Sequence, residues 1–152
     1  MTNKIRGFEV VADNMRKTTG EINLPTRADS KSAGYDIYSP IKASVKPNEI
    51  VKIWSDVKAY MQDNEVLLID VRSSMGGKWM LANTLGVIDA SYFGNSANDG
   101  NIGVFLKNIS NEVQEIEIGD RIAQCIFVNY LTADNDKPLS DTRTGGFGSS
   151  GK

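Results

Sequence analysis

The last ten residues combine groups that suit a ligand with phosphates and a flat ring. They read Arg143-Thr144-Gly145-Gly146-Phe147-Gly148-Ser149-Ser150-Gly151-Lys152. Hydroxyls, backbone N–H groups and the Arg143 guanidinium bind phosphate oxygens, and Phe147 can stack on a ring. Because ordering glycine costs backbone entropy, this composition predicts a tail that orders when a ligand binds. The alternative is a tail without a role, which is common for glycine- and serine-rich ends.

A second candidate binding segment is Arg72-Ser73-Ser74, directly after the apolar run 65–71. A guanidinium followed by two hydroxyls at a strand-to-helix junction provides several hydrogen-bond donors, and phosphate is their natural guest. The alternative is a capping serine beside a solvated arginine.

The candidate catalytic group is Asp89, in the run Gly86-Val87-Ile88-Asp89-Ala90-Ser91-Tyr92-Phe93-Gly94. A carboxylate with an ordinary pKa of about 4 is ionised at neutral pH and can polarise water. The alternative is an aspartate that closes a turn. Two further segments, Ala33-Gly34-Tyr35-Asp36-Ile37 and Gly119-Asp120-Arg121-Ile122-Ala123-Gln124, are ordinary strand and turn sequences when taken singly.

The composition excludes several kinds of chemistry. The chain has no histidine and one cysteine, Cys125, which lies in an apolar run and is expected in the core. Histidine-based catalysis, histidine metal sites and an internal disulfide are therefore excluded. Any metal must be held by oxygen ligands, which favours Mg²⁺. With 17 Lys and Arg against 19 Asp and Glu, we expect no nucleic-acid partner. No apolar run or signal pattern predicts a membrane association, so a cytoplasmic protein is expected.

The elements that must position these groups are short strands separated by turn residues. The expected strands are 5–11, 35–38, 41–45, 49–53, 57–61, 65–71, 79–83, 101–108, 113–118 and 122–130. At most one short helix is expected, at 73–78, and residues 95–101 form a polar loop. This pattern predicts an all-β sandwich, barrel or jelly roll. We expect one catalytic β domain over residues 1–133 and a flexible linker and glycine-rich lid over 134–152.

Taken together and in order, five of these motifs resemble those of the trimeric dUTP pyrophosphatases (dUTPases). They are Ala-Gly-Tyr-Asp-Ile, Arg-Ser-Ser, Gly-Val-Ile-Asp-x-x-Tyr-x-Gly, Gly-Asp-Arg-Ile-Ala-Gln and Arg-x-Gly-Gly-Phe-Gly-Ser-Ser-Gly. The resemblance extends from about residue 24 to residue 151. The longer loop after Tyr92 looks like dUTPases of bacteriophages and their Gram-positive hosts.

The resemblance implies a jelly-roll-like, distorted β barrel that forms a homotrimer with active sites shared between subunits and closed by the C-terminal tail. It implies hydrolysis of dUTP to dUMP and pyrophosphate with Mg²⁺, which lowers dUTP and supplies dUMP for dTMP synthesis. The metal is held largely by the triphosphate and waters, with no direct side-chain ligand. Asp36 matches an acidic residue near those waters, with a structural role as the alternative.

The resemblance also assigns roles residue by residue. Asp89 matches the carboxylate that orients the attacking water, and Tyr92 matches the aromatic residue that leaves no room for a ribose 2′-hydroxyl. The residues matching the uracil and deoxyribose site are Asn83, Val87, Ile88, Tyr92, Gly103 and Phe147. The residues matching the phosphate site are Arg72, Ser73, Ser74, Gln124, Arg143, Ser149 and Ser150.

The chain departs from the family pattern at three places. Ser91 stands where the family often has aspartate, and residues 95–100 are inserted before the next strand, which affects the match of Gly103. The tail has one residue fewer than usual after Arg143, so Arg143 acts from a shifted position, or Arg121 or Lys152 replaces it. Two other functions are considered: dCTP deaminase, which shares the fold, and a regulatory protein partner acting in addition to catalysis, for which the inserted loop offers a surface.

Overall fold

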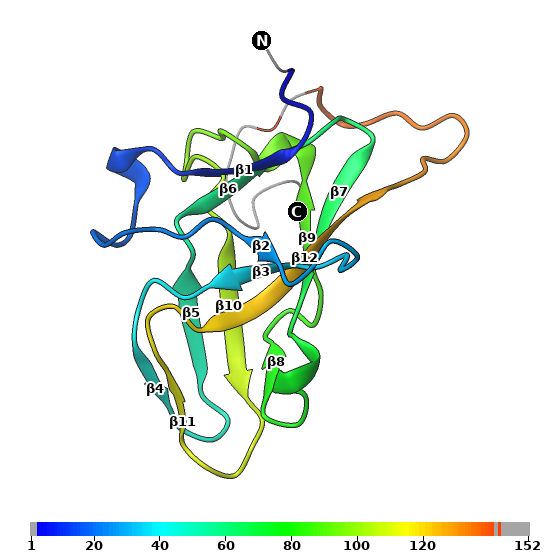
Figure 1. Ribbon diagram of the computed structural model, residues 1–152. Coiled ribbons are helices and arrows are strands. Elements are labelled where there is room, and N and C mark those ends of the chain that lie inside the picture. Colours follow the sequence, from blue (N-terminus) through cyan, green and yellow to red (C-terminus); the bar gives the residue numbers. More distant parts are fainter. Residues whose placement is uncertain (1–2, 142, 144–152) are drawn as a thin grey trace.

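The computed structural model describes residues 3–141 and residue 143, and these residues are built almost wholly from short antiparallel strands (Figure 1). The strands are β1 (Gly7–Val10), β2 (Thr26–Arg27), β3 (Tyr35–Tyr38), β4 (Ala43–Val45), β5 (Ile50–Trp54), β6 (Val57–Tyr60), β7 (Glu65–Asp70), β8 (Trp79–Leu81), β9 (Gly86–Asp89), β10 (Gly103–Asn108), β11 (Gln114–Ile116) and β12 (Arg121–Asn129). Three short 3₁₀ turns accompany them: η1 (Asp13–Met15), η2 (Ser73–Met75) and η3 (Ala90–Tyr92).

The strands form four antiparallel sheets. The largest has the order β2-β3-β12-β7-β9, the next has the order β5-β10-β8, and β1-β6 and β11-β4 form two-stranded pairs. The long strand β12 is central, because it pairs with β3 on one side and with β7 on the other. The sheets do not close into a complete barrel, and they confirm the predicted all-β, distorted jelly-roll-like fold.

The core contains alternating side chains of the larger sheets. On β10, Val104 and Leu106 are fully buried, and Leu67 and Ile69 of β7 lie in the same apolar cluster. Burying such a side chain contributes about 1.5–3 kcal/mol, so this cluster is the main support of the strands around it. Cys125 of β12 is a free thiol in this core, as predicted, and burial raises its pKa.

Several elements differ from those expected from the sequence. Strand β9 lies outside the strands expected from sequence, because glycine and aspartate at its ends disfavour strands. It forms because β7 offers a partner, with Ile88 opposite Leu67 and Asp89 opposite Val66. The helix expected at 73–78 is confined to η2, since two glycines follow and Gly77 has a φ of +83°.

Among residues 3–141 and residue 143, no helix is long and apolar enough to cross a membrane. Strand β12 ends at Asn129, and residues 130–141 contain neither strand nor helix. The predicted boundary at 133/134 falls within this segment and stays a prediction.

Candidate active site

A cavity of about 280 Å³ lies where the turn after β8, strand β9, η3 and the start of β10 meet. Its lining residues are Ile69, Leu81, Asn83, Gly86, Val87, Ile88, Asp89, Tyr92, Gly103 and Arg143. The cavity therefore brings together most of the residues predicted to hold uracil and deoxyribose, with the predicted catalytic carboxylate. Gly103 lines the same cavity despite the inserted loop that precedes it.

Strand β9 presents one face and one edge to this cavity. Ile88 is buried while Val87 and Asp89 point outward, and the Asp89 side chain is 52% exposed. The strand lies at the end of its sheet, paired only with β7 among the described strands. A strand edge of this kind carries backbone N–H and C=O groups that no second strand satisfies. It can therefore hydrogen-bond to the edge of a planar base.

Tyr92, in η3, forms a buried wall of the cavity, with only 3% of its surface exposed. Its hydroxyl donates to the Asn101 carbonyl at 2.6 Å and accepts from Asn98 Nδ2 at 2.8 Å. Burial raises the pKa of Tyr92, and the bond from Asn98 and the charge of Arg143 offset this only in part. The phenol is therefore neutral at physiological pH and acts as a fixed ring.

Arg143 lines the cavity next to Asp89. Its Nη2 donates to Asp89 Oδ2 at 2.7 Å, and its Nε donates to Ser91 Oγ at 3.1 Å. The guanidinium carbon is 5.6 Å from the centre of the Tyr92 ring, and only 8% of the arginine side chain is exposed. Ser91, where the family often has aspartate, thus contacts the tail arginine.

A second cavity, of about 390 Å³, collects basic and hydroxyl groups on another part of the fold. Arg72, Ser74 and Arg121 line it. Behind them lies Asp36 of β3, whose carboxylate is 3.1 Å from Arg72 Nε and 3.6 Å from Arg121 Nη1. Asp36 is 7% exposed, and it holds the two cations next to each other. Ser73 begins η2 beside them and is exposed.

Gln124 of β12 lies close to these residues, because β12 pairs with the strands on both sides of it. It lies opposite Asp36 on β3 and opposite Asp70 on β7. Its Nε2 donates to the Val71 carbonyl at 3.3 Å. A Cβ on Gly34 would lie 2.6 Å from Gln124 Oε1, so glycine at this position leaves the space that the glutamine occupies.

Asp89 and Arg72 lie near opposite ends of β7. Asp89 pairs with Val66, whereas Arg72 follows the other end of that strand, at Asp70. Six residues of extended chain at about 3.3 Å each place these backbones roughly 20 Å apart. Asp89 and Arg72 of one chain therefore line different cavities.

Sequence reasoning missed the apolar floor of the first cavity, formed by Ile69 and Leu81, because buried aliphatic residues look alike along a strand. It considered Arg121 only as a substitute for Arg143, whereas Arg121 pairs with Asp36. Phe147, Ser149, Ser150 and Lys152 lie outside the described residues. Among residues 3–141 and residue 143, no group of three or more acidic or cysteine side chains could hold a metal ion.

Comparison with known proteins agrees with this geometry. The dUTPase family model matches residues 20–151. The deoxyuridine 5′-triphosphate nucleotidohydrolase of Lactococcus lactis is 44% identical over 97% of this chain and 99% of its own. The crystal structure of dUTPase from Streptococcus mutans has a TM-score of 0.75 at 35% identity, covering 85% of this chain and 99% of that one. The dUTPase from phage phi11 of S. aureus has a TM-score of 0.67 at 23% identity, over 89% and 96% of the two chains.

Proposed function

This chain belongs to the dUTPase family, and we propose that its residues hydrolyse dUTP to dUMP and pyrophosphate through a water aligned by Asp89. The observation that carries the proposal is the position of this carboxylate. It ends the edge strand β9, it is half exposed, and it shares a cavity with Tyr92 and with the free edge of β9. A base bound to that edge brings its sugar to the ring and its α-phosphate to the carboxylate.

Selection of the base rests on fixed polar groups. Uracil binds to the backbone of Val87 and Ile88 and to Asn83, whose Nδ2 donates to the Leu85 carbonyl at 3.3 Å in the turn before β9. Cytosine has an acceptor at N3 and a donor at position 4, where uracil has a donor and an acceptor, so polar groups that match uracil are left unpaired. The buried Tyr92 ring packs under the deoxyribose and excludes a 2′-hydroxyl.

The reaction begins with attack of the water on the α-phosphorus. As the water oxygen bonds to the α-phosphorus, its proton passes to Asp89 and then to solvent, and the bond from the α-phosphorus to the oxygen bridging the β-phosphorus breaks. Pyrophosphate leaves and dUMP remains. Negative charge grows on the phosphate oxygens, and Arg72, Ser73, Ser74, Gln124 and Arg143 donate hydrogen bonds to them. The tail residues Phe147, Ser149 and Ser150 complete the site over the base and phosphates.

The donor set around the phosphate cavity fits a magnesium ion bound mainly by substrate. Asp36, the acidic residue nearest these groups, already contacts two arginines, so it reaches the ion only through water. Mg²⁺ commonly keeps several waters and binds through substrate phosphates. When bound, it neutralises charge on the triphosphate.

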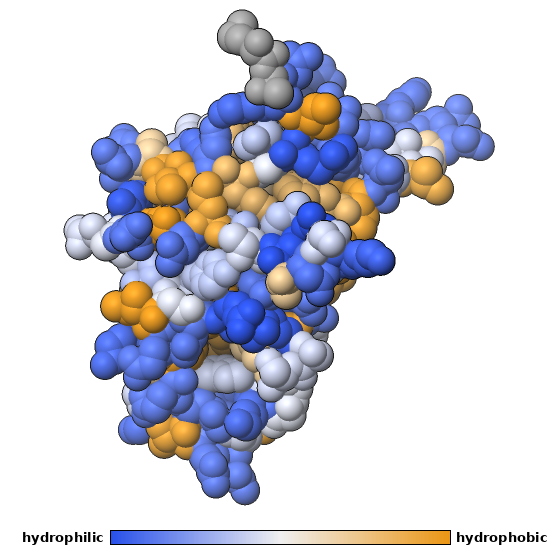
Figure 2. Space-filling model, viewed as in Figure 1, coloured by the Kyte–Doolittle hydropathy of each residue, from blue (hydrophilic) through white to orange (hydrophobic). Residues whose placement is uncertain are grey.

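The separation of the two cavities supports a shared site. The backbones of Asp89 and Arg72 are roughly 20 Å apart along β7. Arg72 lines a different cavity, where it pairs with Asp36, so we infer that the arginine cavity of another subunit supplies the phosphate contacts. Apolar residues also gather on the face over β1 and β6 (Figure 2), where Val10 is 38% exposed. Burial of such a surface between subunits is consistent with a homotrimer.

The test of the substrate is a comparison of dUTP, dTTP, dCTP and UTP, with pyrophosphate and ammonia measured for each. We expect pyrophosphate from dUTP at a kcat/KM well above the others, and no ammonia from dCTP. Ammonia release would instead indicate the deaminase. Equal rates on all four nucleotides would refute the proposed substrate. The regulatory partner stays a prediction, tested by adding dUTP to a complex captured on the full chain.

A further inference from the structure

The hydroxyl of Tyr92 is held entirely by one loop, residues 95–101. It donates to the Asn101 carbonyl at 2.6 Å and accepts from Asn98 Nδ2 at 2.8 Å. A phenol donates one hydrogen bond and accepts in a restricted direction. Two bonds at these distances therefore prevent the ring from rotating about its long axis and from shifting along it. Nothing in the proposed chemistry uses this hydroxyl, since the ring alone faces the sugar.

The orientation of the Asn98 amide follows from its other partners. Its Oδ1 accepts from Asn95 Nδ2 at 2.7 Å and from the Gly100 N–H at 3.0 Å. Both partners are donors, so the oxygen must face them and the nitrogen must face Tyr92. Asn95 is 7% exposed and also donates to the Tyr92 carbonyl at 2.8 Å. The loop therefore binds both the side chain and the backbone of Tyr92.

The loop also packs directly against η3 and its end. Gly100 has a φ of +89°, and a Cβ there would lie 2.9 Å from the Tyr92 carbonyl oxygen and 3.0 Å from Phe93 Cα. The Gly94 N–H donates to the Asp99 carbonyl at 3.1 Å. A glycine in this conformation lets the loop lie closer to Tyr92 than any other residue would permit.

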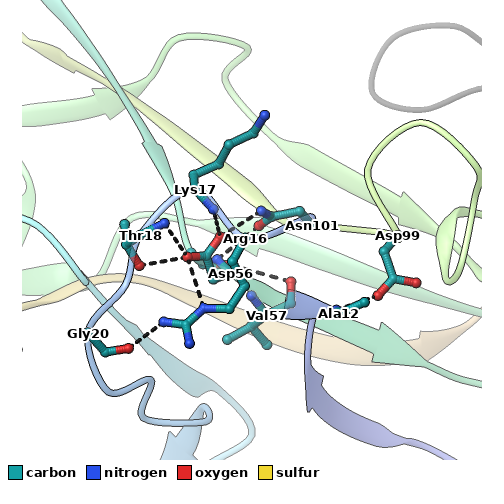
Figure 3. Close-up of polar contacts among 10 residues, drawn as sticks. Ala12, Arg16, Lys17, Thr18, Gly20, Asp56, Val57, Asp99 and Asn101 are labelled. Carbon is teal, nitrogen blue, oxygen red and sulfur yellow. Dashed lines mark hydrogen bonds and ion pairs between the residues drawn. The ribbon is translucent and has the colours of Figure 1, made fainter. Parts of the chain in front are cut away.

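The far side of the loop is anchored to the body of the protein (Figure 3). Asn101 is fully buried, and its Nδ2 and Oδ1 pair with Oδ1 and N of Asp56, each at 2.9 Å. Asp56 in turn accepts from the Lys17 N–H at 2.8 Å and from Thr18 Oγ1 at 2.6 Å. Asp99 Oδ2 accepts from Lys58 Nζ at 2.7 Å and from the Ala12 N–H at 2.8 Å. The loop is thus a rigid support between two fixed parts of the chain.

We infer that Asn98 is a positioning residue that sets the selectivity for deoxyribose by holding the Tyr92 ring against the sugar. The inference rests on the proposed function, in which this ring occupies the place of a 2′-hydroxyl. A ring whose hydroxyl has lost one of its two bonds can tilt, and a tilt opens space for the ribose. The inserted residues 95–100 therefore serve discrimination between dUTP and UTP.

The test replaces Asn98 with aspartate, because N98D keeps an oxygen for Asn95 and Gly100 and replaces the donor to Tyr92 with an acceptor. The hydroxyl has a single hydrogen, so it can donate either to the Asn101 carbonyl or to the new carboxylate but can no longer keep two bonds. The matched control is N111D, which makes the same change at an exposed residue. We expect the ratio of kcat/KM for dUTP to that for UTP to fall about fivefold in N98D, the effect of one hydrogen bond, and to stay constant in N111D. A purely structural defect lowers both rates by the same factor and leaves this ratio unchanged.

A double-mutant cycle with Y92F then shows whether Asn98 acts through the hydroxyl. Y92F should lower the ratio by a similar factor, and N98D should lower it no further in the Y92F background. Equal effects of N98D in both backgrounds would overturn the inference, as would an unchanged ratio in folded N98D. Should N98D fail to fold, Y92F alone tests the inference. A wild-type ratio of kcat/KM for dUTP to that for UTP in Y92F would overturn it, because the hydroxyl would then have no role in selectivity.

A second measurement reads the contact without turnover. The carbon-13 shift of Tyr92 Cζ, assigned by its loss in Y92F, should change in N98D and not in N111D; an unchanged shift would contradict the contact. Wild-type protein without a preference for dUTP over UTP would refute the proposed function, and the role in selectivity with it. A normal wild-type preference that N98D leaves intact would refute the inference alone.

Discussion

Arg143 Nη2 donates to Asp89 Oδ2 at 2.7 Å, so the guanidinium covers the carboxylate that we propose to align the attacking water. The arginine side chain is 8% exposed in this position. The oxygens of a triphosphate carry more negative charge than the Asp89 carboxylate and can bind the same guanidinium. Bidentate contacts between arginine and phosphate are strong. We therefore expect substrate binding to exchange one partner of Arg143 for another and to free Asp89 for the water.

This exchange predicts the behaviour of Arg143 variants. R143A should lower kcat for dUTP by about a hundredfold, as removal of one donor to a developing anion does. R143K should give an intermediate rate, because lysine keeps the charge but lacks the planar fork. Steady-state pyrophosphate release measures both, and K137A, an exposed change on the same segment, is the control. Normal turnover in R143A would exclude a role of this residue in the reaction.

Removal of residues 142–152 tests whether the tail contributes to turnover without contributing to the stability of the fold. The buried core cluster and its packed neighbours end at Phe127, so the thermal midpoint of the truncated protein should equal that of the full chain. Turnover of dUTP should be largely lost, because Arg143, Phe147 and the tail serines are removed together. F147A in the full chain then tests the stacking ring alone, with an expected rise in KM. Full turnover after truncation would show that the tail has no role.

Asp56 is expected to be the most sensitive polar position of the fold. It is fully buried, has a φ of +59°, and accepts hydrogen bonds from two segments of the chain. Asparagine tolerates the same backbone conformation. In D56N, however, an NH₂ group replaces one carboxylate oxygen and faces partners that are themselves hydrogen-bond donors. We expect a loss of about 3 kcal/mol in the free energy of unfolding, measured with urea. D136N, at an exposed position, should be neutral; equal stability of both variants would contradict the network.

The dependence of stability on pH should include Glu65. A hydrogen bond from Arg6, at 2.8 Å from its Nε, holds the pKa of this carboxyl below its usual range. The contribution is therefore present above the unfolded pKa of about 4.3 and is lost as the pH falls through the lower folded-state pKa. In E65Q the urea stability should fall less between neutral and acidic pH than in the wild type. E112Q, an exposed control, should keep the wild-type slope, and an identical slope in E65Q would refute this assignment.

Most strands could be predicted from sequence, because they depend on local patterns, and five of the residues predicted for the base and sugar line one cavity. Alternation and turn residues located β10 and β12, and the motif around Asp89 identified the residues of the first cavity. Local patterns did not predict how far apart Asp89 and Arg72 lie within one chain, since this depends on the register that pairs Asp89 with Val66 and leaves Arg72 beyond the other end of β7. Only the resemblance to the family implied sites shared between subunits.

The inserted loop shows the same limit in another way. Residues 95–101 are polar and glycine-bearing, so a loop was expected, but their contacts depend on residues far away in the sequence. The pairing of Asn101 with Asp56 spans 45 positions, and neither residue carries a local signal of its partner. Asp36 is similar, because an acidic residue in a strand gives no sign that two arginines will enclose it.

The central claim is that Asp89 aligns the attacking water, and D89N tests it most directly, since it keeps the shape of the side chain and removes its charge. Pyrophosphate release from dUTP should fall by roughly a hundredfold to ten-thousandfold, while a nonhydrolysable dUTP analogue still binds with near-normal affinity. D63N, at an exposed turn, should keep the wild-type rate. A D89N protein that hydrolyses dUTP at close to the wild-type rate would contradict the account.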